Sequence, residues 1–419
     1  YTSIKDRIKN LCYSNDPSGK FTWKTVSSTL AYSAHRIPEI SDNIYSIDRS
    51  MEWGFGWDMG PFKVWDIIGV EKSIKRMGEE NIKIPNWVRD MLLDGNDCFY
   101  KYIDNQLSYY DLSTKGYKPL PIADRAMNFM MLKKKNNVIR KNWSASVVDM
   151  GDEIVGVELH SILKEDLNPI DGSIMETLKY AKDWITEHNY KGMVISSDSK
   201  NFSAGANLNM ILDFAEKKDY DSLENVINLM QGLMQELRFA PFPVIAAPFG
   251  FVLGGGYEIC GSCDRIIAAA ESYIGLVEVG MGIIPGAGGN LRMLNNVSDN
   301  IKTMMPGSFP IVQKVFETVG FAKVATSAKE AKKFSYLRKD DRFILNRLNL
   351  LYEAKQEVIN MSDKYKAPEV REFKLPGASG RLVIDASIKG FVKSKKIKFL
   401  VILNKIDEIS AKDFGASAE

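Results

Sequence analysis

The feature that most constrains this fold is residues 244–294, which contain a buried strand, two glycine-rich turns and, in apolar sequence, the glutamates Glu258 and Glu278. The stretch begins with VIAAP, an apolar run typical of a buried strand, and continues into three consecutive glycines at 254–256. Glu258 lies in the first turn of the helix-like segment that follows, and Glu278 lies just before the second glycine-rich turn. Carboxylic acids in apolar sequence beside unconstrained backbone are typical of acid–base chemistry.

An earlier turn has the same character. Residues 201–206, NFSAGA, follow a short apolar run and precede a helical pattern. Small residues let a ligand approach the backbone, and N–H groups at the start of a helix have no partner inside it. We therefore expect one N–H group from each turn to bind a single carbonyl oxygen and to stabilise the negative charge that develops on it. Glu258 and Glu278 would lie beside that carbonyl, and their apolar neighbours would raise the pKa of both.

Composition excludes several classes of protein. The chain has 419 residues, of which 45% are hydrophobic and 26% charged, and this favours a globular protein of two or three domains. A formal net charge of +2 argues against a nucleic-acid binder. Four cysteines are too few for a disulfide framework, so a reducing compartment, the cytoplasm, is expected. The longest apolar stretch is broken by prolines and glycines, which is not the pattern of a membrane span.

The order of patterns along the chain predicts four regions. Residues 1–110 are helix-biased, 111–141 form a linker with a helix in it, 142–305 form an α/β core, and 306–419 form a C-terminal helical region. Within the core, Ser144 to Met150 and Ile154 to Leu159 alternate across a Gly-Asp turn, which predicts a hairpin. In the first region, Pro61 is suited to the first position of a helix.

Three motifs carry a family resemblance. NFSAGANL, LGGGYEICGSCDRIIAA and GLVEVGMGIIPGAGGNLRML closely resemble the enoyl-CoA hydratase/isomerase (crotonase) superfamily, over about residues 142 to 300. The resemblance implies an α/β spiral of stacked strand–strand–helix turns closed by C-terminal helices. It implies an oxyanion hole for a thioester carbonyl from the backbone N–H groups of Ala206 and Gly255, with Glu258 activating water and Glu278 delivering a proton. It places coenzyme A near Lys200 and Ala204, and for Lys200 a solvated loop lysine is the alternative.

The function implied by this resemblance is an enoyl-CoA hydratase of fatty-acid β-oxidation, which adds water to a trans-2-enoyl-CoA and gives a 3-hydroxyacyl-CoA. The alternatives are a Δ3-Δ2 enoyl-CoA isomerase, in which one glutamate shuttles a proton, and a non-catalytic acyl-CoA-binding module of a larger dehydrogenase. The expected partners are an acyl-CoA substrate and, since relatives are often trimers, further copies of the chain. Asn207 stands where the family usually has Asp, and we expect it to cap the following helix.

The N-terminal region carries a second resemblance. Residues 47–77, IDRSMEWGFGWDMGPFKVWDIIGVEKSIKRM, resemble the C-terminal helical domain of 3-hydroxyacyl-CoA dehydrogenases. The order of the two regions resembles microbial fusion proteins of β-oxidation, so we expect the chain to be the C-terminal part of a dehydrogenase–hydratase. No strand followed by GxGxxG is present, so NAD is expected only on a domain absent from this chain, and no dehydrogenase activity is expected of this chain alone.

Three other features favour structural roles. Cys260 and Cys263 form a lone CxxC without a partner pair, which favours a structural role over a metal site, and no metal is expected. The three histidines are scattered and lie near no nucleophile elbow, so a hydrolase triad is disfavoured. Arg292 could face a coenzyme A phosphate, but a surface arginine is the expectation.

Overall fold

The computed structural model describes residues 3–103, 106–121, 125–301 and 309–395, in two compact units, Tyr1–Ala123 and Asp124–Glu419. The division between the units falls inside the segment 111–141 that the sequence predicts as a linker. In the described ranges, no helix combines the length and the apolar character that crossing a membrane would require.

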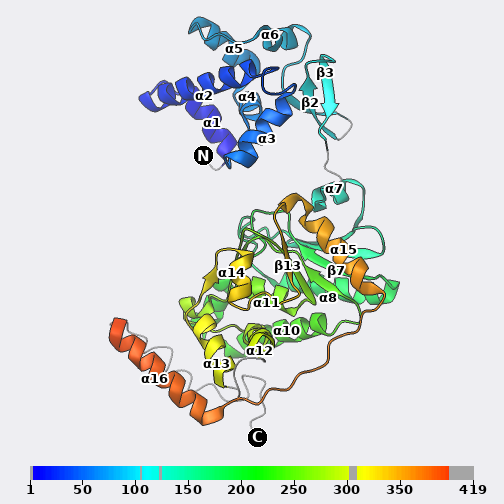
Figure 1. The fold of residues 1–419 in the computed structure, drawn as a ribbon, viewed down its shortest axis with the longest axis vertical. Helices are drawn as coiled ribbons and strands as arrows, with labels where there is room; N and C mark the ends of the chain where they lie inside the picture. Colours follow the sequence, from blue (N-terminus) through cyan, green and yellow to red (C-terminus); the bar gives the residue numbers. More distant parts are fainter. Residues whose placement is uncertain (1–2, 104–105, 122–124, 302–308, 396–419) are drawn as a thin grey trace. The chain divides into compact units, whose positions relative to one another are not determined.

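The first unit is a helical bundle with a small sheet (Figure 1). Its helices are α1 (Ile4–Cys12), α2 (Pro17–His35), α3 (Ile44–Gly54), α4 (Pro61–Ile68), α5 (Val70–Glu79) and α6 (Asn86–Leu93). Helix α4 begins with Pro61, as predicted, and the buried carboxylate of Asp48 accepts the N–H groups of Phe62 and Lys63 at 2.8 and 3.1 Å. Asp48 thus supplies, from α3, the cap that Gly60 at the helix start lacks.

The end of this unit differs from the helical prediction. Strands β1 (Tyr100–Ile103), β2 (Gln106–Asp111) and β3 (Gly116–Pro119) form an antiparallel sheet. Each of β1 and β2 carries two tyrosines, and aromatic residues suit a pleated, half-buried surface better than a helix. The sheet joins the aromatic core of the helices through the buried Tyr110 of β2, and Phe99, just before β1, contacts the ring of Trp65 at a centroid distance of 5.3 Å.

The second unit is built on two sheets. The larger has the order β13-β10-β8-β7-β6-β5-β4, and the smaller has the order β12-β11-β9. The antiparallel pair β5–β6 confirms the predicted hairpin, while β6, β7, β8, β10 and β13 run parallel. The strands are β4 (Val138–Lys141), β5 (Ala145–Asp149), β6 (Ile154–Leu159), β7 (Gly192–Ser196), β8 (Val244–Ala246), β9 (Gly250–Leu253), β10 (Arg265–Ala269), β11 (Ser272–Gly275), β12 (Val324–Ala325) and β13 (Arg342–Ile344).

The chain passes from one sheet to the other at each turn. It enters the larger sheet with β8, crosses to the smaller with β9, and returns through α11 (Gly255–Ser262) to β10 and then β11. Strands β9 and β11 pair in parallel, so successive turns stack. This is the spiral of strand–strand–helix turns that the sequence analysis expects.

Helices cover both faces of the larger sheet (Figure 1). Helix α8 (Gly172–His188) packs on β5, β6 and β7, and α15 (Leu350–Ser362) packs on β7, β8 and β10 from the other side. Burial on both faces explains why these strands are continuous apolar runs. The remaining helices are α7 (Phe129–Lys134), α9 (Leu208–Lys217), α10 (Tyr220–Arg238), η1 (Glu278–Met281), α12 (Gly289–Ile301), α13 (Phe309–Val315), η2 (Phe316–Gly320), α14 (Ala328–Lys333), η3 (Arg347–Asn349) and α16 (Gly377–Lys395).

The C-terminal region is not helical throughout, as the sequence prediction had it. Strands β12 and β13 interrupt it, because each finds a free edge: β12 pairs with β11, and β13 pairs with β10. Local helix and strand propensities contain no information about pairing between segments that lie far apart in the sequence. Of the tail for which helices are predicted, α16 ends at Lys395, and residues 396–419 lie outside the described residues.

Candidate active site

The first predicted turn pairs Ala206 with Ile170 as an isolated parallel bridge. Ile170 donates its N–H to the carbonyl oxygen of Gly205 at 2.9 Å and accepts the N–H of Asn207 at 3.2 Å. Because these bonds use the groups on either side of Ala206, the N–H of Ala206 itself points away from Ile170. Gly205 has φ +107°, a conformation that residues with a side chain rarely adopt. Asn207 accepts the N–H of Asn209 at 3.2 Å, which confirms it as the cap of α9.

The second turn brings Gly255 beside Ala206. Gly254, with φ +52° and ψ −125°, ends β9 and donates its N–H to the carbonyl of Gly275 at 2.9 Å. Gly255 is then the first residue of α11, where an N–H group has no partner inside the helix. A methyl group added at Gly255 would lie 3.5 Å from the backbone nitrogen of Ala206. The two predicted N–H donors therefore lie side by side.

Glu258 is buried and held by backbone. It is 3% exposed, and its Oε1 accepts the N–H groups of Ala287 and Gly289, both at 2.8 Å. Its Oε2 lies 3.9 Å from the position that a methyl group at Gly255 would take. Burial raises the pKa of Glu258, as the sequence predicts, and the two N–H bonds act in the opposite direction.

Glu278 lies beside Gly254, just after strand β11 of the smaller sheet. It begins the short helix η1 after β11, and its Oε1 lies 3.2 Å from the position of a methyl group at Gly254. Both of its carboxyl oxygens are buried and have no hydrogen-bond partner. Burial, and then the charge on Glu258, raise the pKa of Glu278 to about 8.

The two carboxyl groups therefore have unlike surroundings. Glu278 keeps its proton at neutral pH because burial and the charge on Glu258 outweigh the opposing effect of the backbone N–H groups of Glu278 and Val277. Glu258, in contrast, accepts two N–H donors that favour its charged form. Pairs of titratable groups whose environments differ in this way are arrangements in which one acts as acid and the other as base. The structure thus brings together four of the predicted site residues, Glu258, Glu278, Ala206 and Gly255.

The two predicted coenzyme A contacts are Lys200, just before the first turn, and Ala204, within it. Lys200 is exposed, 3.4 Å from Asp166, in a separate polar pocket of about 430 Å³ that Arg347 also lines. In the described part of the chain, no hydrogen bond or ion pair joins Lys200 to either glutamate. Ala204 is half-buried, and its N–H already bonds the carbonyl of Leu167 at 2.7 Å.

Sequence reasoning missed two contributors and misplaced a third. The N–H groups of Ala287 and Gly289 hold Glu258, and the only signal for them is the glycine-rich turn at 285–289 itself. Arg292 is 5% exposed and bonds Gln235 at 3.2 Å, so the expectation of a surface arginine is wrong. It is buried because α12 packs on α11 through Gly261, where a methyl group would lie 3.3 Å from the Cβ of Arg292.

The CxxC pair lies at the far end of α11. Cys260 and Cys263 are buried, and the Cys263 thiol donates to the carbonyl of Ile259 at 3.3 Å. Within the described ranges, no three side chains of His, Cys, Asp or Glu gather where they could hold a metal ion.

Comparison with known proteins agrees with this architecture. The family model for enoyl-CoA hydratase/isomerase matches residues 155–306. A probable enoyl-CoA hydratase of Bacillus subtilis is 30% identical over 197 residues, which are 45% of this chain and 75% of that protein. The chain belongs to the enoyl-CoA hydratase/isomerase (crotonase) superfamily. An enoyl-CoA hydratase structure from Bacillus anthracis is 22% identical, with a TM-score of 0.44, and covers 63% of this chain and 96% of that one.

Some longer relatives match the N-terminal unit as well as the crotonase-like part of the chain. A probable 3-hydroxyacyl-CoA dehydrogenase of Bacillus subtilis is 37% identical over 416 residues, which are 96% of this chain and 51% of that protein. A putative fatty acid oxidation complex trifunctional enzyme of Rickettsia felis is 26% identical over 405 residues, which are 96% of this chain and 50% of that protein. This chain thus spans about half the length of these curated relatives and is homologous to multifunctional proteins of fatty-acid oxidation.

Proposed function

We propose that this chain is an enoyl-CoA hydratase, which reversibly adds water to a trans-2-enoyl-CoA and gives a 3-hydroxyacyl-CoA. The observation that carries the proposal is the unlike surroundings of two neighbouring glutamates: the buried carboxyl oxygens of Glu278 have no hydrogen-bond partner, and the carboxyl of Glu258 accepts two backbone N–H groups. Hydration needs both a base for the water and an acid for the α-carbon, whereas moving a double bond needs only one group that shuttles a proton.

In this mechanism the thioester oxygen accepts the N–H groups of Ala206 and Gly255. Those two donors stabilise the enolate that forms as water attacks the β-carbon. Glu258 takes a proton from the attacking water, and the protonated Glu278 gives its proton to the α-carbon. The substrate gains one hydroxyl group and one hydrogen, and the two carboxyl groups end with their protonation states exchanged. Solvent then restores the starting states.

We place this reaction in fatty-acid oxidation, since the longer relatives bear names of that pathway. Lys200 would contact a phosphate of coenzyme A, since its ammonium group is exposed, and this contact would compete with its 3.4 Å pairing with Asp166. We infer that the helical first unit corresponds to the C-terminal domain of 3-hydroxyacyl-CoA dehydrogenases. Support comes from its GPF sequence at the start of α4 and from the match that runs across both units.

Crotonyl-CoA tests the proposal. The intact chain should consume the enoyl-thioester absorbance, and Glu258→Gln and Glu278→Gln should each lower kcat by about 10²-fold or more. Glu271→Gln changes an exposed glutamate on the turn between β10 and β11 and serves as the matched control. Turnover that survives both active-site changes would contradict the two-glutamate mechanism. A shift of the double bond in a trans-3-enoyl-CoA without water addition would favour the isomerase, and binding without any turnover would favour an acyl-CoA-binding module.

A further inference from the structure

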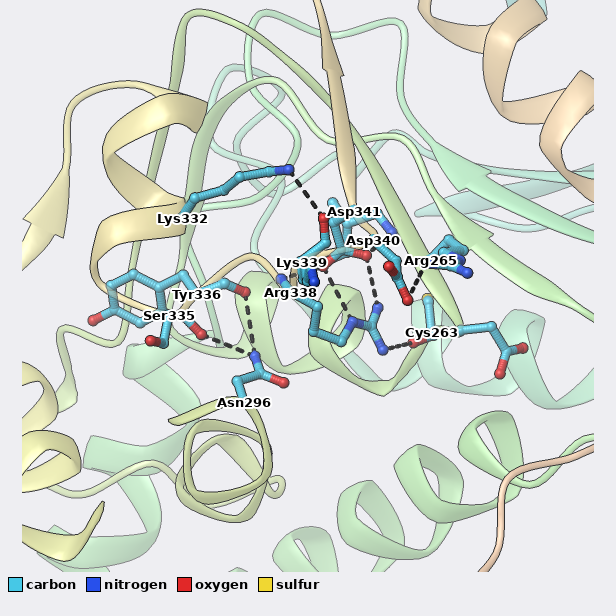
Figure 2. Close-up of polar contacts among 12 residues, drawn as sticks. Cys263, Arg265, Asn296, Lys332, Ser335, Tyr336, Arg338, Lys339, Asp340 and Asp341 are labelled. Atoms are coloured by element: carbon cyan, nitrogen blue, oxygen red, sulfur yellow. Dashed lines mark hydrogen bonds and ion pairs between the residues drawn. The ribbon is translucent and has the colours of Figure 1, made fainter. Parts of the chain in front are cut away.

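Tyr336 lies outside every motif that the function uses. It follows α14, in the short connection to β13, and its side chain is fully buried. Figure 2 shows it beside Ser335 and Asn296, whose side-chain amide donates to the carbonyl groups of both residues, at 2.9 Å for Ser335 and 3.5 Å for Tyr336. Two residues further on, Arg338 donates to the carbonyl of Cys263 at 2.9 Å, so the connection is fixed at both ends.

The hydroxyl group of Tyr336 lies between β11 and β12 where their direct backbone pairing ends. Strands β11 and β12 pair as Ile274 with Ala325 and Gly275 with Val324, so the next pair in this register would be Leu276 with Lys323. Instead, Leu276 donates its N–H to the Tyr336 hydroxyl at 3.1 Å, and that hydroxyl donates to the carbonyl of Lys323 at 2.8 Å. The phenol is therefore a bridge that ends the ladder and holds Leu276 away from Lys323.

This bridge lies two residues before Glu278. The chain leaves β11 at Gly275, and the position of Leu276 sets where η1 begins and hence where the Glu278 carboxyl lies. Burial raises the pKa of the Tyr336 phenol to about 12, the bond from Leu276 acts against this rise, and the charge on Glu278 adds to it. Glu278 is thus close enough to the phenol for its charge to act there.

Tyr336 also contacts the segment that carries the other glutamate. Its carbonyl oxygen accepts the hydroxyl of Tyr257 at 2.9 Å, and the two rings pack edge to face with centroids 4.9 Å apart. Tyr257 directly precedes Glu258 on α11 and is itself fully buried. One residue therefore bonds to the neighbours of both carboxyl groups, through its hydroxyl on one side and its backbone on the other.

We propose that Tyr336 is a positioning residue that holds Glu278 at a fixed place relative to Glu258, an inference that rests on the hydratase function proposed above. Removing the hydroxyl leaves two outcomes for the backbone. The N–H of Leu276 and the carbonyl of Lys323 either stay buried without a partner or close on each other as a direct ladder bond. Closing the ladder moves the start of η1, and leaving the two groups unpaired removes the bond that fixes Leu276. Either change releases the carboxyl of Glu278 from its fixed place.

Tyr336→Phe is the decisive variant because it keeps the ring and removes only the bridge. Displacement of an acid by about 1 Å costs up to about 100-fold in rate, so we expect kcat to fall by about 10- to 100-fold while KM stays within about threefold. Since Glu278 must be protonated to act, kcat falls at alkaline pH. A less well enclosed carboxyl has a lower pKa, so this alkaline limb should move to lower pH in the variant.

Tyr365→Phe is the matched control, because it removes a half-buried hydroxyl that donates to Asp264 at 2.9 Å at the amino end of β10. Both variants should lose stability in urea, and only Tyr336→Phe should lose kcat and shift the alkaline limb. An unchanged kcat and pH profile in Tyr336→Phe, or an equal change in Tyr365→Phe, would overturn the inference. If Tyr336→Phe does not fold, Asn296→Ala is the second variant, because it removes a bond to the connection between α14 and β13. It should lower kcat and move the alkaline limb to lower pH, both by a smaller amount.

A readout without turnover separates this inference from the function on which it rests. The pKa of Glu278 is measurable from the pH dependence of urea unfolding, as the difference between each protein and the same protein carrying Glu278→Gln. We expect a lower pKa in Tyr336→Phe than in the unchanged chain. If the chain does not hydrate crotonyl-CoA and this pKa still falls, the positioning stands and the hydratase proposal fails. If hydration occurs and neither kcat nor this pKa changes, the positioning fails alone.

Discussion

The carboxyl of Glu278 links the chemistry of the site to the stability of the fold. Both of its oxygens are buried without a hydrogen-bond partner, and its pKa is about 8. A glutamate in an unfolded chain titrates near pH 4.3, roughly the value of model peptides. The folded protein therefore keeps one proton that the unfolded chain releases between these two values.

The sign and size of the effect follow from this difference. The stabilisation is fully present below about pH 4, and the free energy of unfolding falls as the pH rises towards 8, by about 1.4 kcal/mol per pH unit. Over the whole window the loss amounts to about 5 kcal/mol, a large part of the stability of an ordinary domain. Glu278→Gln keeps the size of the side chain and is neutral at every pH, so this loss is absent from the variant.

The assay is urea unfolding of both proteins, followed by circular dichroism, at several values between pH 5 and pH 9. The stability of Glu278→Gln relative to the unchanged chain should rise steadily across this range and level off above pH 8. Glu271→Gln, at an exposed position, should follow the unchanged chain throughout. A constant difference between Glu278→Gln and the unchanged chain would refute the reasoning, because the folded protein would then hold no extra proton.

Three further changes test other parts of the structure. Gly254→Ala places a side chain at φ +52°, with its methyl group 3.2 Å from Glu278, so urea unfolding should show a loss of about 1–3 kcal/mol and crotonyl-CoA turnover should drop sharply. Lys355→Met removes the buried ammonium that donates to the carbonyl of Met150 at 2.6 Å. It should cost about 1–3 kcal/mol in urea while kcat per folded molecule is unchanged. Asp48→Ala uncaps α4 and should lower the free energy of unfolding of the first unit alone by about 1–2 kcal/mol, measured by calorimetry.

Much of the site follows from local sequence, because its parts are short motifs whose geometry is set by backbone. Gly205 and Gly254 adopt the positive φ values that glycine permits, and each places a donor beside it. The raised pKa of both glutamates also follows from apolar neighbours. The catalytic roles of these groups stay a prediction until turnover is measured.

What the sequence does not reveal is contact between distant segments. The donors that make Glu258 unlike Glu278 come from the turn before α12, and no spacing rule indicates which carboxyl they reach. The same holds for Tyr336, whose hydroxyl meets Leu276 only because β12 and α14 fold back on β11. In the first unit, strands β1 to β3 were missed because short aromatic segments fit helix and strand patterns alike.

The edge strand β13 completes the larger sheet from beyond the end of the family match. The family match ends at residue 306, yet β13 covers the open side of β10, and α15 behind it buries the outer face of the sheet. A chain cut at the end of the recognisable motif would leave the backbone groups of β10 unpaired and an apolar face uncovered, a template for aggregation. The segment that matches the family is therefore smaller than the folded unit around it, and substitutions in β13 or α15 can destabilise the candidate site from a distance.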